Sequence, residues 1–414
     1  MTVLEMGEKA KIASFELSKL STDEKNNILK NCASALIENL SVILNANKID
    51  LDNAIEKGIS GALIDRLTLN QQRVESMADG LIDVAKLDDP VGEVTNMIKR
   101  PNGLMIGKKS VPMGVVGIIF EARPNVTADA YGLCLKSGNA TILRGGKEAI
   151  NSNIAVVKIF RKVLSDMGYN EDFVQMVEDT NRDSARQMMT LNGYIDVLIP
   201  RGGAGLIQTV VKESTVPVIE TGVGNCHVFV DESGDFNKAI EIILNAKTQR
   251  PGVCNACESL LIHKNIANDF VPLISAALID NGVEIFGDEI SKNLVDDINM
   301  ASEEDWGKEY LDYKISMKIV ENIDEAISHI RKYGTKHSEC IITENYSNSQ
   351  KFLDEIDAAA VYVNASTRFT DGSQFGFGAE IGISTQKLHA RGPMGLKELT
   401  TTKYIIYGNG QIRK

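Results

Sequence analysis

The residue best suited to covalent chemistry is Cys254, which lies in the stretch 246–263. A helical pattern ends just before it at Pro251-Gly252, because proline lacks a backbone donor and glycine adopts angles that other residues avoid. An apolar, β-prone run follows the cysteine. We expect a thiol on such a turn to be partly exposed and close to free backbone N–H groups, and both conditions favour the thiolate. Cys254 is therefore a candidate nucleophile.

Cys254 and its neighbour Cys257 also have other possible roles. A free cysteine is often a small buried hydrophobic residue, so the turn alone leaves a packing role open for Cys254. The C-x-x-C spacing also occurs in redox dithiols and zinc sites. A zinc site needs a second ligand pair, and the chain has no other C-x-x-C or H-x-H at a usable spacing, so we expect no metal. A thioredoxin-type pair belongs directly after the first strand of a small domain, so we expect Cys257 to be a packing residue.

Size and charge limit the classes of function. A chain of 414 residues is too long for one ordinary domain, so two or three are expected. The net charge of -12, with no long basic run, disfavours nucleic acid and anionic membranes as partners, because both require a basic face. The sequence has no signal peptide, no run long enough to span a membrane and only six unpatterned cysteines. We therefore expect a cytoplasmic protein with reduced thiols.

Alternating strands and helices must position this chemistry. Residues 9–82 have helical periodicity, with a capping box at Ser21-Thr-Asp-Glu24. A first block of apolar runs and helical patterns follows, and a second block continues from it. The expected strands are 114–120, 140–143, 173–177, 196–200 and 216–220 in the first block, and 226–230, 259–263, 283–286, 315–320 and 339–343 in the second. The runs lack polar alternation, so we expect an α/β fold with two doubly wound open parallel sheets, where ligands bind at the carboxyl ends of strands.

Two further β-capable segments lie outside these blocks. They are a hairpin over 94–111, with a Pro-Asn-Gly turn at 101–103, and a terminal run over 401–410. Neither has a sequence neighbour that completes a sheet, and exposed strand edges are a liability. We expect the two segments to pair as an arm that contacts a second subunit, giving a homo-oligomer of two or more chains. The expected domains are 1–93 with 112–224, 225–395, and an oligomerisation arm of 94–111 with 396–414.

Glycine-rich turns with basic residues follow two strands of the first block. One is Leu143-Arg-Gly-Gly-Lys147 and the other is Pro200-Arg-Gly-Gly-Ala-Gly205. Glycines let backbone N–H groups approach a phosphate, although ordinary connecting turns look similar. An enzyme that selects NAD tends to carry an acid where Arg144 and Lys147 stand. Basic residues there favour a 2′-phosphate, so we expect NADP(H) to bind at these turns, including Gly202 and Gly203.

Five long stretches resemble the aldehyde dehydrogenase superfamily, and the resemblance covers nearly the whole chain. They are EARPNVTAD (121–129), LKSGNATILRGGKE (135–148), IDVLIPRGG (195–203), ETGVGNCH (220–227) and QRPGVCNA (249–256). The resemblance implies a cofactor-binding domain, a catalytic domain and a β oligomerisation arm. It also implies a nucleophile at Cys254, an oxyanion-hole amide at Asn125 and a nicotinamide-ribose carboxylate at Glu309. Glu220 falls where hydrolytic members keep a general base, and we expect it beside the cofactor.

Within the superfamily, the chain is most similar to the branch that reduces L-glutamyl 5-phosphate to L-glutamate 5-semialdehyde with NADPH in proline biosynthesis. This resemblance implies that Cys254 displaces phosphate and forms a thioester, which is then reduced. Water is not a reactant, so Glu220 need not act as a base. The substrate carboxylate and phosphate need cations. The candidates are Arg123, Arg201, Arg250, Arg368 and Arg391; His337 could also face the substrate, or could be an ordinary loop histidine.

Two other classes of function remain open at this stage. Another acylating dehydrogenase, acting on an acyl-CoA or a different acyl phosphate, would share the fold and the nucleophile. A non-enzymatic binding protein built on two α/β domains would instead have an unreactive Cys254.

Overall fold

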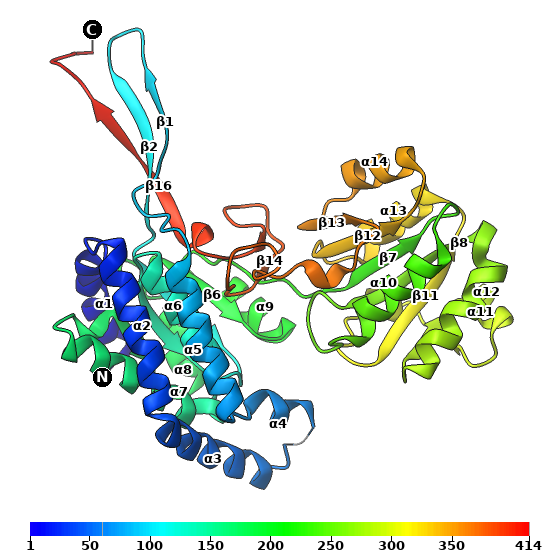
Figure 1. Ribbon diagram of the computed structural model, residues 1–414, viewed down its shortest axis with the longest axis horizontal. Helices are drawn as coiled ribbons and strands as arrows, with labels where there is room; N and C mark the ends of the chain where they lie inside the picture. The colour runs from blue at the N-terminus through cyan, green and yellow to red at the C-terminus, as the bar shows by residue number, and fades with distance from the viewer. Residues whose placement is uncertain (60, 414) are drawn as a thin grey trace. The chain divides into compact units, whose positions relative to one another are not determined.

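The computed structural model of the chain describes residues 1–59 and 61–413. Its contacts divide the chain into two compact units, each with a parallel sheet (Figure 1). Unit 1 comprises Met1–Thr221, Gly376–Gly382 and Met394–Lys414, and unit 2 comprises Gly222–Phe375 and Ile383–Pro393. No helix in the described part of the chain has both the length and the apolar character that a membrane crossing requires.

Unit 1 begins with the helices predicted over 9–82. They are α1 (Val3–Leu17), α2 (Thr22–Glu38), α3 (Leu40–Glu56), α4 (Ala62–Leu67) and α5 (Gln71–Lys86). The capping box is confirmed, because the Glu24 N–H donates to Ser21 Oγ at 3.3 Å and the Ser21 N–H donates to Glu24 Oε2 at 2.8 Å.

The sheet of unit 1 has four parallel strands in the order β5-β4-β3-β6. The strands are β3 (Val115–Phe120), β4 (Ala140–Arg144), β5 (Val174–Met176) and β6 (Val197–Arg201). The helices between and after them are α6 (Asn125–Lys136), α7 (Ile150–Asp166), α8 (Arg182–Met189) and α9 (Ala204–Glu213). Connections between parallel strands of one sheet are right-handed. The connections β3-α6-β4 and β4-α7-β5 run in one direction across the sheet and therefore place α6 and α7 on one face. The connection β5-α8-β6 runs in the opposite direction and places α8 on the other face. The alternation predicted for the first block is confirmed up to β6.

The predicted strand over 216–220 is wrong as an extended element. Only a single bridge joins Val218 to Leu198, through the Leu198 N–H to the Pro217 carbonyl at 2.8 Å and the Ile219 N–H to the Leu198 carbonyl at 2.9 Å. Pro217 has no N–H to donate, so an apolar run that looks β-prone cannot continue the ladder here.

Unit 2 contains a seven-stranded parallel sheet in the order β10-β9-β11-β8-β7-β12-β13. The strands are β7 (Cys226–Val230), β8 (Cys257–His263), β9 (Glu284–Gly287), β10 (Asn299–Met300), β11 (Lys314–Val320), β12 (Ser338–Ile342) and β13 (Ala360–Val363). The helices are α10 (Phe236–Thr248), α11 (Lys264–Asp280), α12 (Glu289–Leu294), α13 (Ile323–Tyr333) and α14 (Tyr346–Glu355). A second doubly wound sheet was predicted and is confirmed; β10 and β13 were not predicted.

Successive side chains of the central strands of unit 2 enter two different cores. Val228 and Leu260 pack in a cluster with α10 and α11, whereas their sequence neighbours Phe229 and Leu261 pack in a cluster with α13. Both faces of the sheet are therefore apolar, which explains why the strands show no polar alternation in the sequence.

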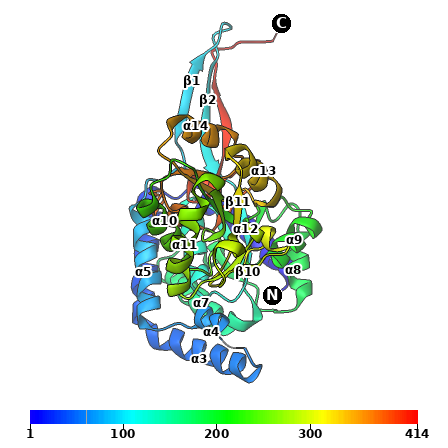
Figure 2. The same cartoon turned by 90° about the vertical axis from the view of Figure 1, so that its right-hand side faces the viewer.

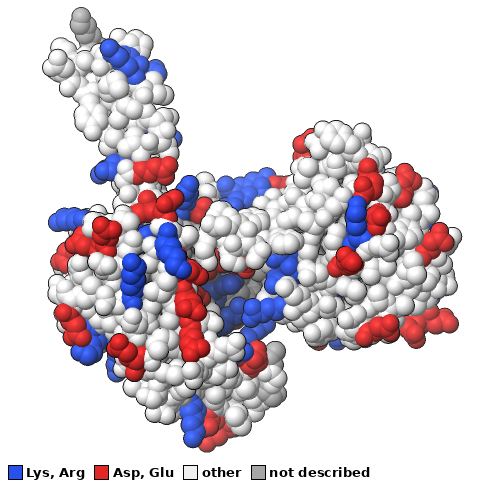
Figure 3. All heavy atoms as spheres, viewed as in Figure 1, with Lys and Arg blue, Asp and Glu red and all other residues white. Residues whose placement is uncertain are grey.

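The arm is a three-stranded antiparallel sheet in which the predicted hairpin and terminal run pair. Strand β2 (Met105–Pro112) lies between β1 (Val94–Lys99) and β16 (Thr400–Tyr407), as both ribbon views show (Figure 1, Figure 2). Little of the visible arm surface is charged (Figure 3). Large apolar side chains exposed on it are Val94, Met97, Ile98, Tyr404, Ile406 and Tyr407.

Candidate active site

Cys254 lies on the turn between α10 and β8 and is half-buried. The other five cysteines, all in the described part of the chain, are buried. The prediction of a partly exposed thiol on a turn is therefore confirmed. Cys257 packs in the core beside α10, and burial raises the pKa of its thiol to about 12, so its predicted packing role is also confirmed.

The backbone of Cys254 is in very close contact with Gly224, which leads into β7. A Cβ atom added to Gly224 would lie only 1.4 Å from the Cys254 carbonyl oxygen. The same carbonyl accepts a hydrogen bond from the Cys226 thiol at 3.2 Å. The Gly224 N–H in turn donates to Glu309 Oε1 at 2.7 Å. Through this one glycine, the structure brings the predicted Glu309 carboxylate next to the turn of the predicted nucleophile.

A half-buried guanidinium also lies beside this turn. Arg368 donates from Nε to Gln249 Oε1 at 2.9 Å and from Nη1 to the Asn255 side chain. The Asn255 amide donates back to the Thr370 carbonyl at 2.9 Å. Burial lowers the pKa of Arg368, the positive charge of Arg250 lowers it further, and the Cys254 thiol acts in the opposite direction. Two of the predicted arginines thus place positive charge close to Cys254, a condition that favours the thiolate.

His337 was predicted as a possible substrate contact and is fully buried in unit 2. Its Nδ1 lies 2.8 Å from Ser338 Oγ and 3.7 Å from the Cys226 thiol, and Ser338 Oγ lies 2.7 Å from Thr370 Oγ1. The imidazole therefore belongs to an interior polar network that joins the start of β7, at Cys226, to the start of β12, at Ser338. It lies in the loop before β12, as the alternative of an ordinary loop histidine expected, and its role as a substrate contact stays a prediction.

Four of these groups in unit 2 precede strands, whereas Arg368 follows β13. Gly224 comes before β7, Cys254 before β8, Glu309 before β11 and His337 before β12. In a parallel sheet, residues that precede strands meet at the amino edge.

In unit 1, Asn125 is the first residue of α6 and is exposed. Its Nδ2 donates to Asp129 Oδ2 at 3.0 Å, one turn further along the helix. Burial raises the pKa of Asp129 to about 6, while the hydrogen bond from Asn125 and the charge of Arg201 oppose the rise. The predicted oxyanion-hole amide is therefore oriented by a carboxylate that sequence analysis did not identify.

The predicted cofactor residues lie at the carboxyl ends of β4 and β6. Arg144 Nη2 donates to the Thr180 carbonyl at 2.8 Å, and its Nε is buried with no acceptor among the described residues. Lys147 is exposed just after β4. A Cβ on Gly202 would lie 2.6 Å from the Glu121 side chain, so Gly202 permits a close approach, whereas a Cβ on Gly203 would be at an ordinary 3.8 Å from Glu121 Oε1.

Three other predicted residues lie in settings that do not by themselves assign a role in catalysis. Arg123 is half-buried, and its N–H donates to the Glu121 carbonyl at 2.7 Å; Glu220 is half-buried after the Val218 bridge. Arg391 donates to Asp357 Oδ1 at 2.7 Å, which makes it a structural ion pair. The roles given to these residues stay predictions.

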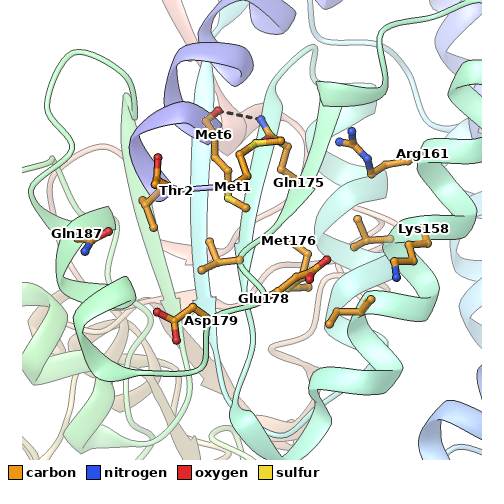
Figure 4. Close-up of a pocket in the computed structure, with 14 residues that line it drawn as sticks. Met1, Thr2, Met6, Lys158, Arg161, Gln175, Met176, Glu178, Asp179 and Gln187 are labelled. Atoms are coloured by element: carbon orange, nitrogen blue, oxygen red, sulfur yellow. Dashed lines mark hydrogen bonds between the residues drawn. The ribbon is translucent and has the colours of Figure 1, made fainter.

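A pocket of about 670 Å³ lies around the edge strand β5 (Figure 4). The start of α1, one side of α7 and the residues after β5 line it, including Lys158 on α7 and Glu178 and Asp179 at the carboxyl end of β5. Gln175 reaches across and donates to the Met6 carbonyl at 2.9 Å. The volume suits a small molecule. Sequence analysis missed this pocket, and neither Arg144 nor Lys147 lines it.

Sequence analysis also missed a buried ion pair near the Cys254 turn. Lys247 Nζ lies 2.7 Å from Glu258 Oε2, and neither side chain is exposed. Burial raises the pKa of Glu258 to about 7, and Lys247 opposes the rise. The signal was present, because Glu258 is a charged residue within an otherwise apolar, parallel strand.

We expect Gly224→Ala to displace the Cys254 turn, because the added methyl group would overlap the Cys254 carbonyl. Overpacking of this kind costs about 1–3 kcal/mol. Urea unfolding should show the loss, and peptide mapping after iodoacetamide treatment should show a changed alkylation rate at Cys254. Gly205→Ala is the matched control, since its Cβ would meet nothing within 4 Å. If both variants unfold and alkylate like the unmodified protein, the close approach at Gly224 has no effect on the turn.

Comparison with known proteins agrees with this geometry. The Aldehyde dehydrogenase family matches residues 2–284. The chain is 65% identical over 407 residues, 98% of each chain, to the gamma-glutamyl phosphate reductase of Clostridium perfringens. It is 61% identical to that of Caldicellulosiruptor bescii, over 100% of this chain and 99% of the relative. The crystal structure of the Thermotoga maritima gamma-glutamyl phosphate reductase matches with a TM-score of 0.98 at 52% identity, covering 100% of both chains. The chain therefore belongs to the aldehyde dehydrogenase family, in its gamma-glutamyl phosphate reductase branch.

Proposed function

We propose that this protein reduces L-glutamyl 5-phosphate to L-glutamate 5-semialdehyde and phosphate with NADPH, through a thioester on Cys254. The observation that carries the proposal is the setting of Cys254: a half-buried thiol on a turn, with Arg368 beside it and Glu309 held by the adjoining Gly224. The names of the relatives supply the substrate and suggest a step of proline biosynthesis. Reduced cysteines suit a cytoplasmic location.

The first step uses Cys254 as the nucleophile. Its thiolate attacks the acyl carbon, a C–S bond forms, and the C–O bond to phosphate breaks. Phosphate leaves with the electron pair of that bond. The charges of Arg368 and Arg250 favour the thiolate and could also hold the phosphate or the carboxylate of the substrate. Arg123 and Arg201 in unit 1 are the other cations that we assign to substrate binding.

Asn125 is the residue that we assign to the oxyanion. A side-chain amide has two N–H groups, and one of those on Asn125 is donated to Asp129. The second can be donated to the oxygen that becomes negative as the acyl carbon turns tetrahedral. The Asp129 hydrogen bond fixes the amide before substrate arrives, so no free energy is spent on orienting it during the reaction.

NADPH, when bound, supplies the hydride that reduces the thioester. The residues that fit this cofactor are Arg144, whose buried Nε has no acceptor among the described residues, exposed Lys147, and the glycine turn of Gly202 and Gly203, where Gly202 allows a close approach. Glu309 would hold the nicotinamide ribose. Glu220 would lie beside the cofactor without acting as a base, because no water has to be activated.

Replacing Cys254 tests the covalent step. We expect Cys254→Ser to lower turnover by at least roughly a thousandfold with less than about 1 kcal/mol change in stability, because a serine hydroxyl is not ionised there. The assay follows NADP reduction from the semialdehyde, with and without phosphate. Cys257→Ala is the control and should keep most of the activity. A Cys254→Ser enzyme with a tenth of the activity would exclude the thioester, and an inactive but folded Cys257→Ala enzyme would mean that the wrong thiol was chosen.

Substrate trials separate this function from that of another acylating dehydrogenase. Oxidation of the semialdehyde should require phosphate and should not proceed with coenzyme A in its place. Activity with coenzyme A and none with phosphate would assign the chain to acyl-CoA chemistry.

Arg144 and Lys147 should determine the preference for NADP. Replacing both by alanine removes charge-assisted phosphate contacts, which are worth about 1.5–3 kcal/mol each. We expect the ratio of kcat/KM for NADPH to that for NADH to fall by at least about a hundredfold. Lys158→Ala provides the comparison, because Lys158 lines the separate pocket at β5. A larger loss of NADPH preference in Lys158→Ala than in the Arg144/Lys147 variant would mean that the 2′-phosphate binds in that pocket. An unmodified enzyme that prefers NADH would contradict NADP selection altogether.

We also propose that the arm joins subunits into a dimer or larger homo-oligomer. One edge of β16 pairs with β2, and exposed Tyr404, Ile406 and Tyr407 leave this strand with an uncovered apolar surface. Ending the chain after Leu399 should therefore cause dissociation or aggregation, as measured by sedimentation. Full-length protein that sediments as a monomer at micromolar concentration would contradict the oligomer.

A further inference from the structure

The loop before β11 carries Glu309 and is tied to the body of unit 2 at several points. Glu309 Oε1 accepts from the Gly224 N–H at 2.7 Å, and the Trp306 carbonyl accepts from Asn225 Nδ2 at 2.9 Å. The Tyr310 ring stacks on Phe286 with centroids 5.7 Å apart. These contacts hold both ends of the segment 306–310 and point the Glu309 carboxylate at the lead-in of β7.

Leu311 is the strained point of this loop. Its φ is 53°, in the left-handed region that a branched side chain rarely adopts. Such a conformation persists only where the surroundings fix it. Here the Leu311 N–H donates to Glu258 Oε1 at 3.1 Å. Glu258 is fully buried in β8, so it is a rigid acceptor rather than a mobile surface carboxylate.

Lys247 explains how a carboxylate can occupy this place. Its ammonium lies 2.7 Å from Glu258 Oε2, the oxygen that does not bind Leu311, and it is itself fully buried at the end of α10. Two buried charges are costly to desolvate, and hydrophobic residues of the same volume are often at least as stable. Stability alone therefore does not account for the pair. Its geometry assigns one carboxylate oxygen to Lys247 and the other to the Glu309 loop.

We propose that Glu258, fixed by Lys247, is a positioning residue that holds the Glu309 loop in place for cofactor binding. It touches neither substrate nor cofactor and acts through the Leu311 N–H. The inference rests on the proposed function of Glu309 as the carboxylate that binds the cofactor ribose. It adds that the same strand, β8, follows the Cys254 turn and supports the cofactor loop, so nucleophile and cofactor share one rigid support.

Two double variants that replace both charged residues of the pair distinguish a positioning role of Glu258 from a packing role. Lys247→Met/Glu258→Gln keeps an oxygen that can accept from Leu311, and Lys247→Met/Glu258→Met removes it at similar volume. We expect the dissociation constant for NADPH, titrated by its own fluorescence, to rise about tenfold in the second variant and less than about threefold in the first, as for the loss of one hydrogen bond. Equal dissociation constants in both doubles would overturn the proposal. Lys238→Met/Glu344→Gln, which removes an exposed ion pair of α10, is the matched control.

Trp306 gives a readout that needs neither cofactor nor turnover. It is the only tryptophan of the chain, is 9% exposed and lies in the same loop as Glu309. Its emission should shift to longer wavelength in the Met/Met variant alone. If that variant does not fold, hydrogen exchange of the unmodified protein tests the proposal instead. The Leu311 amide should be protected, and exchange at the rate of an open loop would overturn the proposal.

Glu309→Gln distinguishes this inference from the function on which it rests. If this variant binds NADPH as tightly as the unmodified enzyme, the role of Glu309 fails and the positioning proposal fails with it. If it binds more weakly while both double variants bind normally, Glu309 keeps its role and only the positioning proposal is overturned.

Discussion

The site in unit 2 depends on a contact that only glycine permits, where the Cα of Gly224 lies against the Cys254 carbonyl. A Cβ at this position would lie 1.4 Å from that oxygen. The contact sets the distance between the segment that precedes β7 and the turn that precedes β8. It also aims the Gly224 N–H at Glu309, so the Cys254 turn and the Glu309 loop are positioned by one residue. Arg368 and the Cys226 thiol then fill the remaining positions around the Cys254 turn.

The residues that we predict to be functional lie at opposite edges of the two sheets. In unit 1 the predicted cofactor residues Arg144, Lys147 and Gly202 follow strands, as is usual in doubly wound sheets. In unit 2 Cys254 and Glu309 precede strands. Apolar clusters occupy both faces of the second sheet, and the predicted functional residues lie at the strand ends. Polar groups at the strand ends can satisfy one another or meet a ligand.

Carboxylates with raised pKa values recur as supports rather than as reacting groups. Asp129 orients the Asn125 amide, and Glu258 accepts from the Leu311 N–H, and for both burial is the largest cause of the raised pKa. Each holds an element that we assign to the chemistry, one the oxyanion and one the cofactor. Glu258 is fully buried and Asp129 is half-buried. Acceptors held in this way restrict rotation, so the groups that they hold need little reorganisation when a ligand binds.

The sequence by itself determined the two α/β blocks, the helical start, the arm and the family, because these follow from apolar periodicity, breaker residues and long matching stretches. It also singled out Cys254, since a Pro-Gly turn before a strand is a local feature. The tertiary structure alone decided what lies around that thiol. Arg368 reaches Asn255 on the same turn from more than a hundred residues away, and Gly224 packs on the Cys254 carbonyl through a contact with no sequence pattern. Pro217 reduced an expected strand to one bridge. His337, Glu258 and Lys247 are chemically ambiguous in sequence, and only burial and the partners that folding brings to them determine what each can do.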